Sequence, residues 1–323
     1  MMQFYKKRDF GALISDTFNF VKLYGKNYFK NYFVINGLLI ILMAVLVFFG
    51  FKNIFSLIFE GIGGGNSASI GRYFLENIVQ IIFTSLFIFL VFILISVVNY
   101  SYPVLYLKRL IETGNKNIAV DEIMSDVKKN IGKIFKLFLG FVFIVFPLYL
   151  VVYGLGYSYT MTYRIQGLYF LLVIFLTPVM TNVVNFLIYD YFNRGKGFFS
   201  SLSYAIRSQF SYQQYNQKSP FWKYWGTTVI LYILQQVVAY ALAFILVFII
   251  ILSLGLSLNM SSAETFYITL VLTVMAYPLI IIISLIMSNF ISLCSGFMYY
   301  DSRTDLHREM DLTEIDSIGR DEV

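Results

Sequence analysis

The sequence is poor in the residues on which soluble enzymes depend. Only 13% of its 323 residues are charged, and histidine and cysteine each occur once. A single histidine, His307, excludes the zinc-binding helix of a metalloprotease, which needs two, and disfavours a serine–histidine dyad. A single cysteine excludes an intramolecular disulfide, and Cys294 lies in an apolar run where a thiol acts as a small hydrophobic group. We expect no metal and no cofactor.

Long apolar runs dominate the sequence instead. Hydrophobic residues make up 59% of the chain and aromatic residues 19%. They gather into runs as long as the roughly 20 residues that a helix needs to cross a bilayer, which excludes a soluble enzyme. Six runs contain no Asp, Glu, Lys or Arg and are predicted to span the membrane: 32–50, 78–107, 137–157, 167–189, 225–258 and 266–300.

The distribution of basic residues predicts the orientation of these six crossings. An even number of crossings places both termini on one side of the membrane. All but three of the 24 Lys and Arg residues fall on that side, the exceptions being Lys52, Arg72 and Arg164. Because basic residues are retained in the cytoplasm, we expect both termini to be cytoplasmic.

Each cytoplasmic segment contains a stretch with one apolar face at helical spacing. These faces are Phe10, Leu13, Ile14, Phe18, Val21 and Tyr24 in the first segment, Val120, Ile123, Met124, Val127, Ile131 and Ile134 in the second, and Phe198, Leu202, Ala205 and Ile206 in the third. Charged or polar residues lie opposite each face. All three stretches are predicted to form helices in the membrane interface.

These elements together predict an all-α polytopic membrane protein with an internal repeat. One interfacial amphipathic helix followed by two crossings occurs three times, over about 8–110, 111–196 and 197–300. We therefore expect a single membrane domain over 1–300. The remaining residues, 301–323, contain eight Asp or Glu against three Arg and are predicted to form an acidic cytoplasmic tail.

Two groups of residues are candidates for binding. Four lysines of the second cytoplasmic segment are expected to contact anionic lipid headgroups: Lys128, Lys129, Lys133 and Lys136. Neutral polar residues within the spans either mediate close helix packing or line a polar cavity, and the packing role is favoured. The cavity candidates are Asn99, Thr181, Asn185 and Asn289.

Two aspartates, Asp190 and Asp301, end the fourth and sixth crossings. Two adjacent carboxylates can share a proton and support intramembrane hydrolysis. Their flanking sequences lack a glycine-bracketed aspartate motif, so we expect each aspartate instead to face the headgroups and to pair with Arg194 or Arg303. Tyrosines near the ends of the second, fourth and sixth crossings are expected to form an interfacial aromatic belt. They are Tyr100, Tyr102, Tyr189, Tyr191, Tyr299 and Tyr300.

The opening and the end of the membrane domain resemble a known family. The run DFGALISDTFNFVKLYGKNYFKNYF, residues 9–33, and the closing YYDSRTD, residues 299–305, resemble a bacterial six-helix membrane family. That family is related to the membrane domain of glycerophosphoryl diester phosphodiesterases. The resemblance implies an uncharacterised integral membrane protein of the bacterial inner membrane. It implies no catalytic residue, because the phosphodiesterase chemistry belongs to a separate soluble domain.

The sequence thus favours a non-enzymatic integral inner-membrane protein, acting as a scaffold or accessory subunit for envelope components. Its expected partners are membrane lipids and a membrane or cytoplasmic protein, bound through the interfacial helices or the acidic tail. A homo-oligomer is compatible with this interpretation, and nucleic acid is not expected. The alternative is a transporter or lipid-handling protein with a neutral polar cavity between the repeats. An intramembrane enzyme ranks third.

Overall fold

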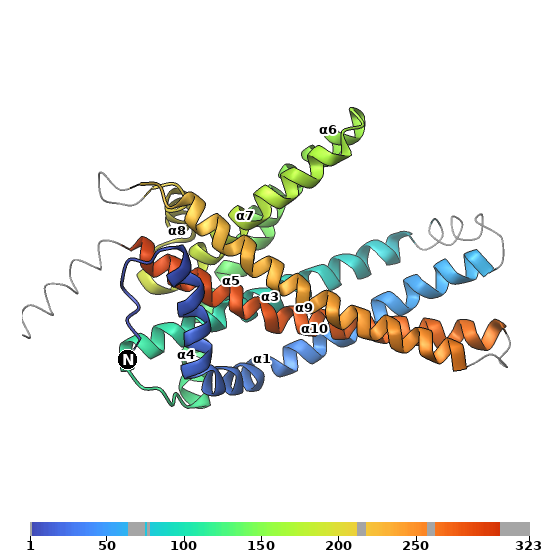
Figure 1. Ribbon diagram of the computed structural model, residues 1–323, viewed down its shortest axis with the longest axis horizontal. Coiled ribbons are helices and arrows are strands. Elements are labelled where there is room, and N and C mark those ends of the chain that lie inside the picture. The colour runs from blue at the N-terminus through green and yellow to red at the C-terminus, as the bar shows by residue number, and fades with distance from the viewer. Residues whose placement is uncertain (1, 64–74, 76–77, 212–217, 257–261, 304–323) are drawn as a thin grey trace, which may run out of the picture. The chain divides into compact units, whose positions relative to one another are not determined.

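The structure is a computed structural model that describes residues 2–63, 75, 78–211, 218–256 and 262–303. Every regular element in these ranges is helical (Figure 1). Six spans in them are long and apolar enough to cross a membrane: Phe10–Leu46, Ile81–Thr113, Ile131–Thr162, Gly167–Arg194, Phe221–Leu242 and Ile282–Ser302. Each overlaps one predicted run, so the prediction of an all-α polytopic membrane protein with six spans is confirmed.

Several of the spans belong to longer helices. The helices are α1 (Phe10–Gly63), α3 (Ile78–Thr113), α4 (Val120–Lys129), α5 (Ile131–Gly140), α6 (Phe146–Thr162), α7 (Gln166–Arg194), α8 (Phe198–Arg207), α9 (Phe221–Leu256) and α10 (Ser262–Ser302). A π-helical turn, η1 (Phe141–Val145), joins α5 to α6. It precedes Pro147, which has no N–H to bond the carbonyl four residues earlier, and the helix widens at that point.

The chain divides into two compact units. The first comprises Met1–Ile35, Val97–Tyr232 and Asn289–Val323, and the second comprises Asn36–Ser96 and Ile233–Ser288. All of α4 to α8 belongs to the first unit, which also holds every site discussed below. A single membrane domain over 1–300 stays a prediction. The acidic tail beyond Arg303 lies outside the described residues.

Two of the predicted amphipathic stretches form separate short helices. They are α4 and α8, which precede the third and fifth spans. The first stretch is instead continuous with its span within α1. The face predicted for α4 is too long, because Asn130 ends that helix: its side chain donates a hydrogen bond to the Asp126 carbonyl at 2.8 Å. Ile131 therefore begins α5 and is 67% exposed. The threefold repeat stays a prediction.

The core of the first unit is aromatic. Tyr28 of α1 packs edge-on against Tyr102 and Tyr106 of α3, with ring centroids 5.1 and 4.9 Å apart. On α7 and α10, Tyr189 stacks on Tyr299 at 5.6 Å. The aromatic belt is therefore wrong for most of its members. Tyr102, Tyr189, Tyr299 and Tyr300 are at most 1% exposed, because their rings pack between helices.

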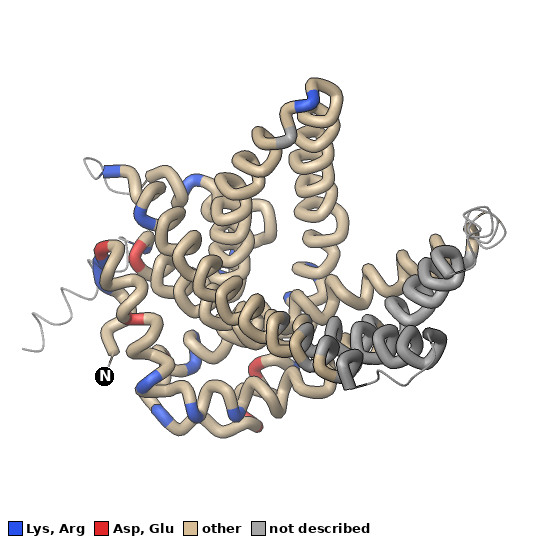
Figure 2. The backbone as a smooth tube through the Cα atoms, turned by 45° about the vertical axis from the view of Figure 1, so that its right-hand side comes forward, with Lys and Arg blue, Asp and Glu red and all other residues tan. Residues whose placement is uncertain are grey.

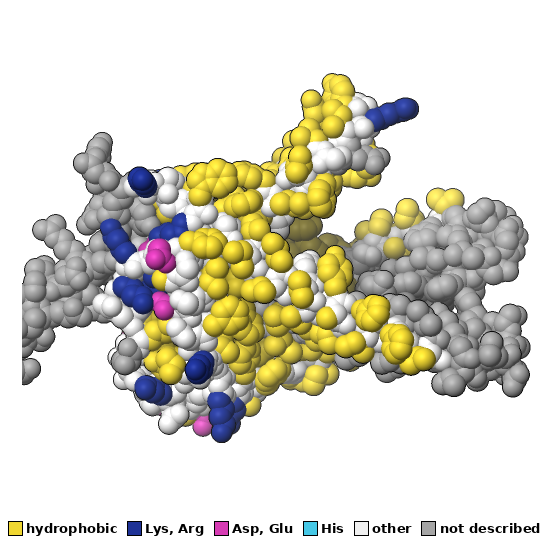
Figure 3. All heavy atoms as spheres, in the orientation of Figure 1, with side chains coloured by type: hydrophobic (Ala, Val, Ile, Leu, Met, Phe, Trp, Pro, Cys, Tyr) yellow, Lys and Arg dark blue, Asp and Glu magenta, His cyan; other side chains and the backbone are white. Residues whose placement is uncertain are grey.

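Charged and apolar side chains separate within the first unit. Most of its Lys and Arg residues gather at the end that carries α4 and α8 (Figure 2). Hydrophobic side chains cover the visible flank of the α6–α7 hairpin (Figure 3), where Leu155, Phe170 and Leu171 are 62–66% exposed. Lipid chains are the natural surroundings of such a surface.

Candidate functional site

The four predicted headgroup-binding lysines lie on α4 and α5 together with large apolar side chains. The α4–α5 surface is defined here as Lys128, Lys129, Ile131, Lys133, Phe135 and Lys136. All of these residues are exposed except Lys133, which is half-buried. Exposed basic residues beside exposed Ile and Phe form the composition that binds at the boundary between lipid and water.

Two of the predicted cavity residues accept hydrogen bonds from tyrosines of α1. The Tyr32 hydroxyl donates to Asn99 Oδ1 at 2.7 Å, and the Tyr28 hydroxyl donates to Asn289 Oδ1 at 2.7 Å. Asn99 is 3% exposed and Asn289 is 1% exposed. These two amides therefore tie α3 and α10 to α1, as interhelical hydrogen bonds between packed spans do.

The other two predicted cavity residues lie on α7. Thr181 Oγ1 shares a hydrogen bond of 2.5 Å with the Tyr232 hydroxyl of α9. Asn185 Nδ2 donates to the Thr181 carbonyl at 2.9 Å, within α7 itself. The structure thus places Asn99 and Asn289 beside the α1 tyrosines, and Thr181 and Asn185 beside one another. Neither cavity described below is lined by any of the four.

Asp301, the penultimate residue of α10, is fully buried and joins three segments of the chain. Lys223 Nζ lies 2.6 Å from its Oδ2, and the Tyr224 hydroxyl donates to the same oxygen at 2.6 Å. The backbone N–H of Arg8 donates to its Oδ1 at 2.6 Å. Short charge-assisted bonds of this kind are the strong ones. Asp301 therefore fastens α9 and the segment before α1 to the end of α10.

Arg8 holds that segment in place. Its guanidinium is fully buried and donates to Asp16 Oδ2 at 2.8 Å and to the carbonyls of Phe4 and Gln3 at 2.7 Å each. It also lies 4.9 Å from the centre of the Phe297 ring. Burial lowers the pKa of the Arg8 guanidinium, and the hydrogen bond and charge of Asp16 oppose that shift. Arginine keeps its proton at neutral pH, so the buried charge is compensated by Asp16.

Asp190 of α7 is also fully buried, but its ion pairs are longer. Arg194 Nη1 lies 3.8 Å and Arg303 Nη1 lies 4.0 Å from Asp190 Oδ1. The Tyr299 hydroxyl donates to the same oxygen at 3.4 Å. Ser201 of α8 neighbours the carboxylate. Asp190 therefore sits among the ends of α7, α8 and α10 without a short charged contact.

These contacts correct the expectation for both aspartates. Asp190 does pair with Arg194 and Arg303, as predicted, but it is buried and does not face headgroups. Asp301 pairs with Lys223, which was not predicted. The two carboxylates bind different side chains, so they form separate structural nodes. The positions of Arg8 and Lys223 were a sequence signal for the Asp301 contacts, because both residues lie near span ends on the same side of the membrane.

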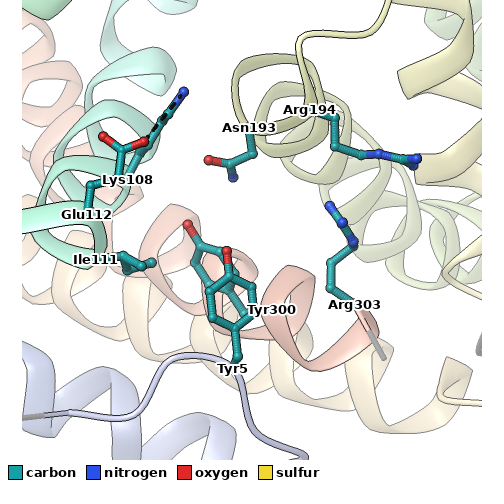
Figure 4. A pocket seen from close by; sticks show the side chains of 8 residues that line it. All are labelled: Tyr5, Lys108, Ile111, Glu112, Asn193, Arg194, Tyr300 and Arg303. Carbon is teal, nitrogen blue, oxygen red and sulfur yellow. Dashed lines mark ion pairs between the residues drawn. The ribbon is translucent and has the colours of Figure 1, made fainter. Parts of the chain in front are cut away.

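A cavity opens beside Asp190 and the two arginines that pair with it. It has a volume of about 340 Å³ and is lined by residues that include Lys108, Glu112, Asn193, Arg194, Tyr300 and Arg303. Figure 4 shows that they come from α3, α7 and the end of α10. We call this cavity the basic pocket. A second and more open cavity of about 470 Å³ is lined in part by Lys7, Lys218 and Lys223, the last of which is bound to Asp301.

No known protein family, curated protein or solved structure matches the chain. The fold and the buried polar nodes define its class: it is a multi-pass α-helical membrane protein. Among the residues that the structure describes, no group of three or more His, Cys, Asp or Glu is placed to hold a metal ion. The resemblance to the six-helix bacterial family stays a prediction.

Proposed function

We propose that the chain is a non-enzymatic integral protein of the bacterial inner membrane, serving as a scaffold or accessory subunit for envelope components. The observation that carries this proposal is which groups the polar side chains of the spans bind. Asn99 and Asn289, which would line a transport path, bond to buried tyrosines of the protein itself. The α4–α5 surface, in contrast, exposes basic and apolar side chains to other molecules.

The α4–α5 surface supports lipid contact as part of this role. Lysine next to exposed Ile131 and Phe135 can place ammonium groups among anionic headgroups while the apolar side chains enter the acyl boundary. A protein partner would bind at the same cytoplasmic end, through the interfacial helices or the acidic tail. The tail beyond Arg303, with seven Asp or Glu, complements a basic partner or the chain's own basic end.

A transporter or lipid-handling protein remains the second candidate, because one buried amide supports it. Asn182 of α7 accepts a hydrogen bond from Thr228 at 2.7 Å, while its Nδ2 atom is buried without a hydrogen-bond partner. An unmet donor of this kind invites a water or a solute. A continuous hydrated path through Asn182 would favour transport over the scaffold.

The orientation can be tested by cysteine labelling, because Cys294 is fully buried and gives a low background. Asn117→Cys lies in the exposed α3–α4 loop, and Thr162→Cys ends α6. In spheroplasts, a membrane-impermeant maleimide is expected to label Thr162→Cys alone, and lysis is expected to expose Asn117→Cys as well. Labelling of Asn117→Cys in intact spheroplasts would contradict cytoplasmic termini.

The scaffold role is tested by what remains bound after gentle purification. The full chain and a variant ending at Arg303 are extracted from native membranes, and stoichiometric partners are identified by mass spectrometry. We expect a protein partner with the full chain and its loss, or a marked reduction, with the truncated variant. A chain that carries one defined solute or lipid and no protein would instead support the second candidate.

A further inference from the structure

The side chains at the bottom of the basic pocket are buried and held in place by their neighbours. The Arg303 side chain is 6% exposed and Tyr300 is fully buried. Arg303 Nη1 donates to the Tyr299 hydroxyl at 2.8 Å, and its guanidinium lies 5.8–6.0 Å from the ring centres of Tyr299 and Tyr204. These contacts hold the guanidinium in position, so that little side-chain freedom is lost when a ligand binds.

Among the described residues, positive charge exceeds negative charge around the pocket. Lys108, Arg194 and Arg303 line it, and the carboxylates that pair with them are Glu112 and Asp190. The three ion pairs are 3.8–4.0 Å long. Charge-assisted hydrogen bonds are normally about 2.7–2.9 Å, so Lys108 and Arg194 can approach an anion without breaking a short ion pair to Glu112 or Asp190.

Helix ends account for part of this charge. Lys108 Nζ donates to the Phe192 carbonyl in the last turn of α7, at 3.2 Å, where a cation offsets the partial negative charge of a helix C-terminus. A lysine that only offsets the charge of a helix end would need no cavity beside it. Here a cavity of about 340 Å³ is lined by the three cationic residues together with Asn193, Tyr5 and Tyr300 (Figure 4).

We propose that the basic pocket binds a phosphate group, either in the headgroup of an anionic phospholipid or as free phosphate. A phosphate group offers several acceptor oxygens, and the guanidinium, ammonium, amide and phenol groups of the pocket all donate. The location fits a headgroup: Lys108 is near the end of the second span, Arg194 ends the fourth, and Arg303 follows the sixth. Basic pockets between spans at this level bind lipid headgroups.

The test is a titration of the purified full-length chain, followed by native mass spectrometry. The probes are phosphatidylglycerol, phosphatidylcholine and inorganic phosphate. We expect one saturable equivalent of phosphatidylglycerol, bound more tightly than phosphatidylcholine. Lys108→Glu is expected to weaken it at least about tenfold, because an attractive charge becomes repulsive. Lys116→Glu is the matched control: it makes the same charge change in an exposed loop outside the pocket, and is expected to change affinity less than about twofold.

Two further variants keep the result interpretable. Lys108→Gln removes the charge but retains a donor for the Phe192 carbonyl, and Tyr5→Phe removes only a hydroxyl; both are expected to weaken binding with unchanged melting temperature.

Competition by inorganic phosphate identifies a free phosphate ligand, and its absence identifies a lipid headgroup. Equal binding by Lys108→Glu, Lys108→Gln and the wild type, or equal affinity for phosphatidylcholine, overturns the proposal. Lys128→Ala with Lys129→Ala tests the α4–α5 surface separately, so failure of one site does not decide the other.

Discussion

Replacing Asp301 by Ala is expected to lower the free energy of unfolding by about 3–5 kcal/mol, because breaking a buried ion pair leaves a charge without compensation. Asp301 is fully buried, and Lys223 Nζ lies 2.6 Å from it with 18% of the lysine side chain exposed. The same substitution removes the acceptor for the Tyr224 hydroxyl and for the backbone N–H of Arg8. The measurement is the denaturation midpoint in detergent, followed by tryptophan fluorescence.

The control is an exposed acidic residue with a weak ion pair. Glu112 is 58% exposed in its side chain and lies 4.0 Å from Lys108. Glu112→Ala is expected to cost less than about 1 kcal/mol, as exposed ion pairs do. Equal losses for the two variants would show that burial at Asp301 does not matter.

A double-mutant cycle separates the charge from the hydrogen bonds. Asp301→Asn retains one oxygen that can accept from Tyr224, but it loses the acceptor for the Arg8 N–H and the negative charge beside the Lys223 ammonium. Adding Lys223→Met removes that ammonium as well, so the double variant is expected to lose less stability than the sum of the single variants. If the stability losses of the two single variants add up to that of the double variant, the effect of Asp301 comes from its hydrogen bonds alone.

Gly296→Ala is expected to destabilise the protein by about 1–3 kcal/mol, because a methyl group at this position overpacks a close helix crossing. A Cβ atom on Gly296 of α10 would overlap the Tyr189 hydroxyl of α7 and would come within 2.9 Å of Leu107 Cδ1 of α3. Tyr189 is fully buried and donates to the Ser292 carbonyl at 3.1 Å, so its ring has little room to move.

Gly132 provides the matched substitution. It also lies in a helix, α5, but a Cβ atom there would meet nothing within 4 Å. Gly132→Ala is expected to be neutral or to stabilise by up to about 1 kcal/mol, because alanine favours the helix over glycine. The ratio of folded to aggregated protein on heating, measured by size exclusion, compares the two variants. A Gly296→Ala protein as heat-resistant as Gly132→Ala would contradict close packing of the three helices.

The sequence predicted the spans well because the cost of placing a charge in lipid acts on each short stretch independently. The run predicted at 167–189 begins where its span, Gly167–Arg194, begins, but the span continues past Asp190, because that carboxylate is buried beside Arg194 and Arg303. The short helices α4 and α8 were predicted for a similar reason, since amphipathic spacing is local. The end of α4 was missed, because a single Asn130 side-chain hydrogen bond interrupted a periodic pattern.

The candidate sites could be predicted only in part. Three of the four α4–α5 lysines are exposed and Lys133 is half-buried, but they are divided between two short helices where the sequence predicted one amphipathic stretch. Asn99 and Asn289 were named as polar groups, but their tyrosine partners lie 67 and 261 residues away along the chain. Composition alone does not distinguish a polar residue that lines a cavity from one that bonds to a neighbouring helix.

The sequence by itself determined that this chain is a six-span helical membrane protein, because hydrophobic length and charge exclusion are properties of single segments. Only the tertiary structure decided which charges are paired. Arg8 and Asp301 are 293 residues apart, and their contact exists because helix packing brings the segment before α1 to the end of α10. The basic pocket has the same origin, since the ends of α3, α7 and α10 create it jointly.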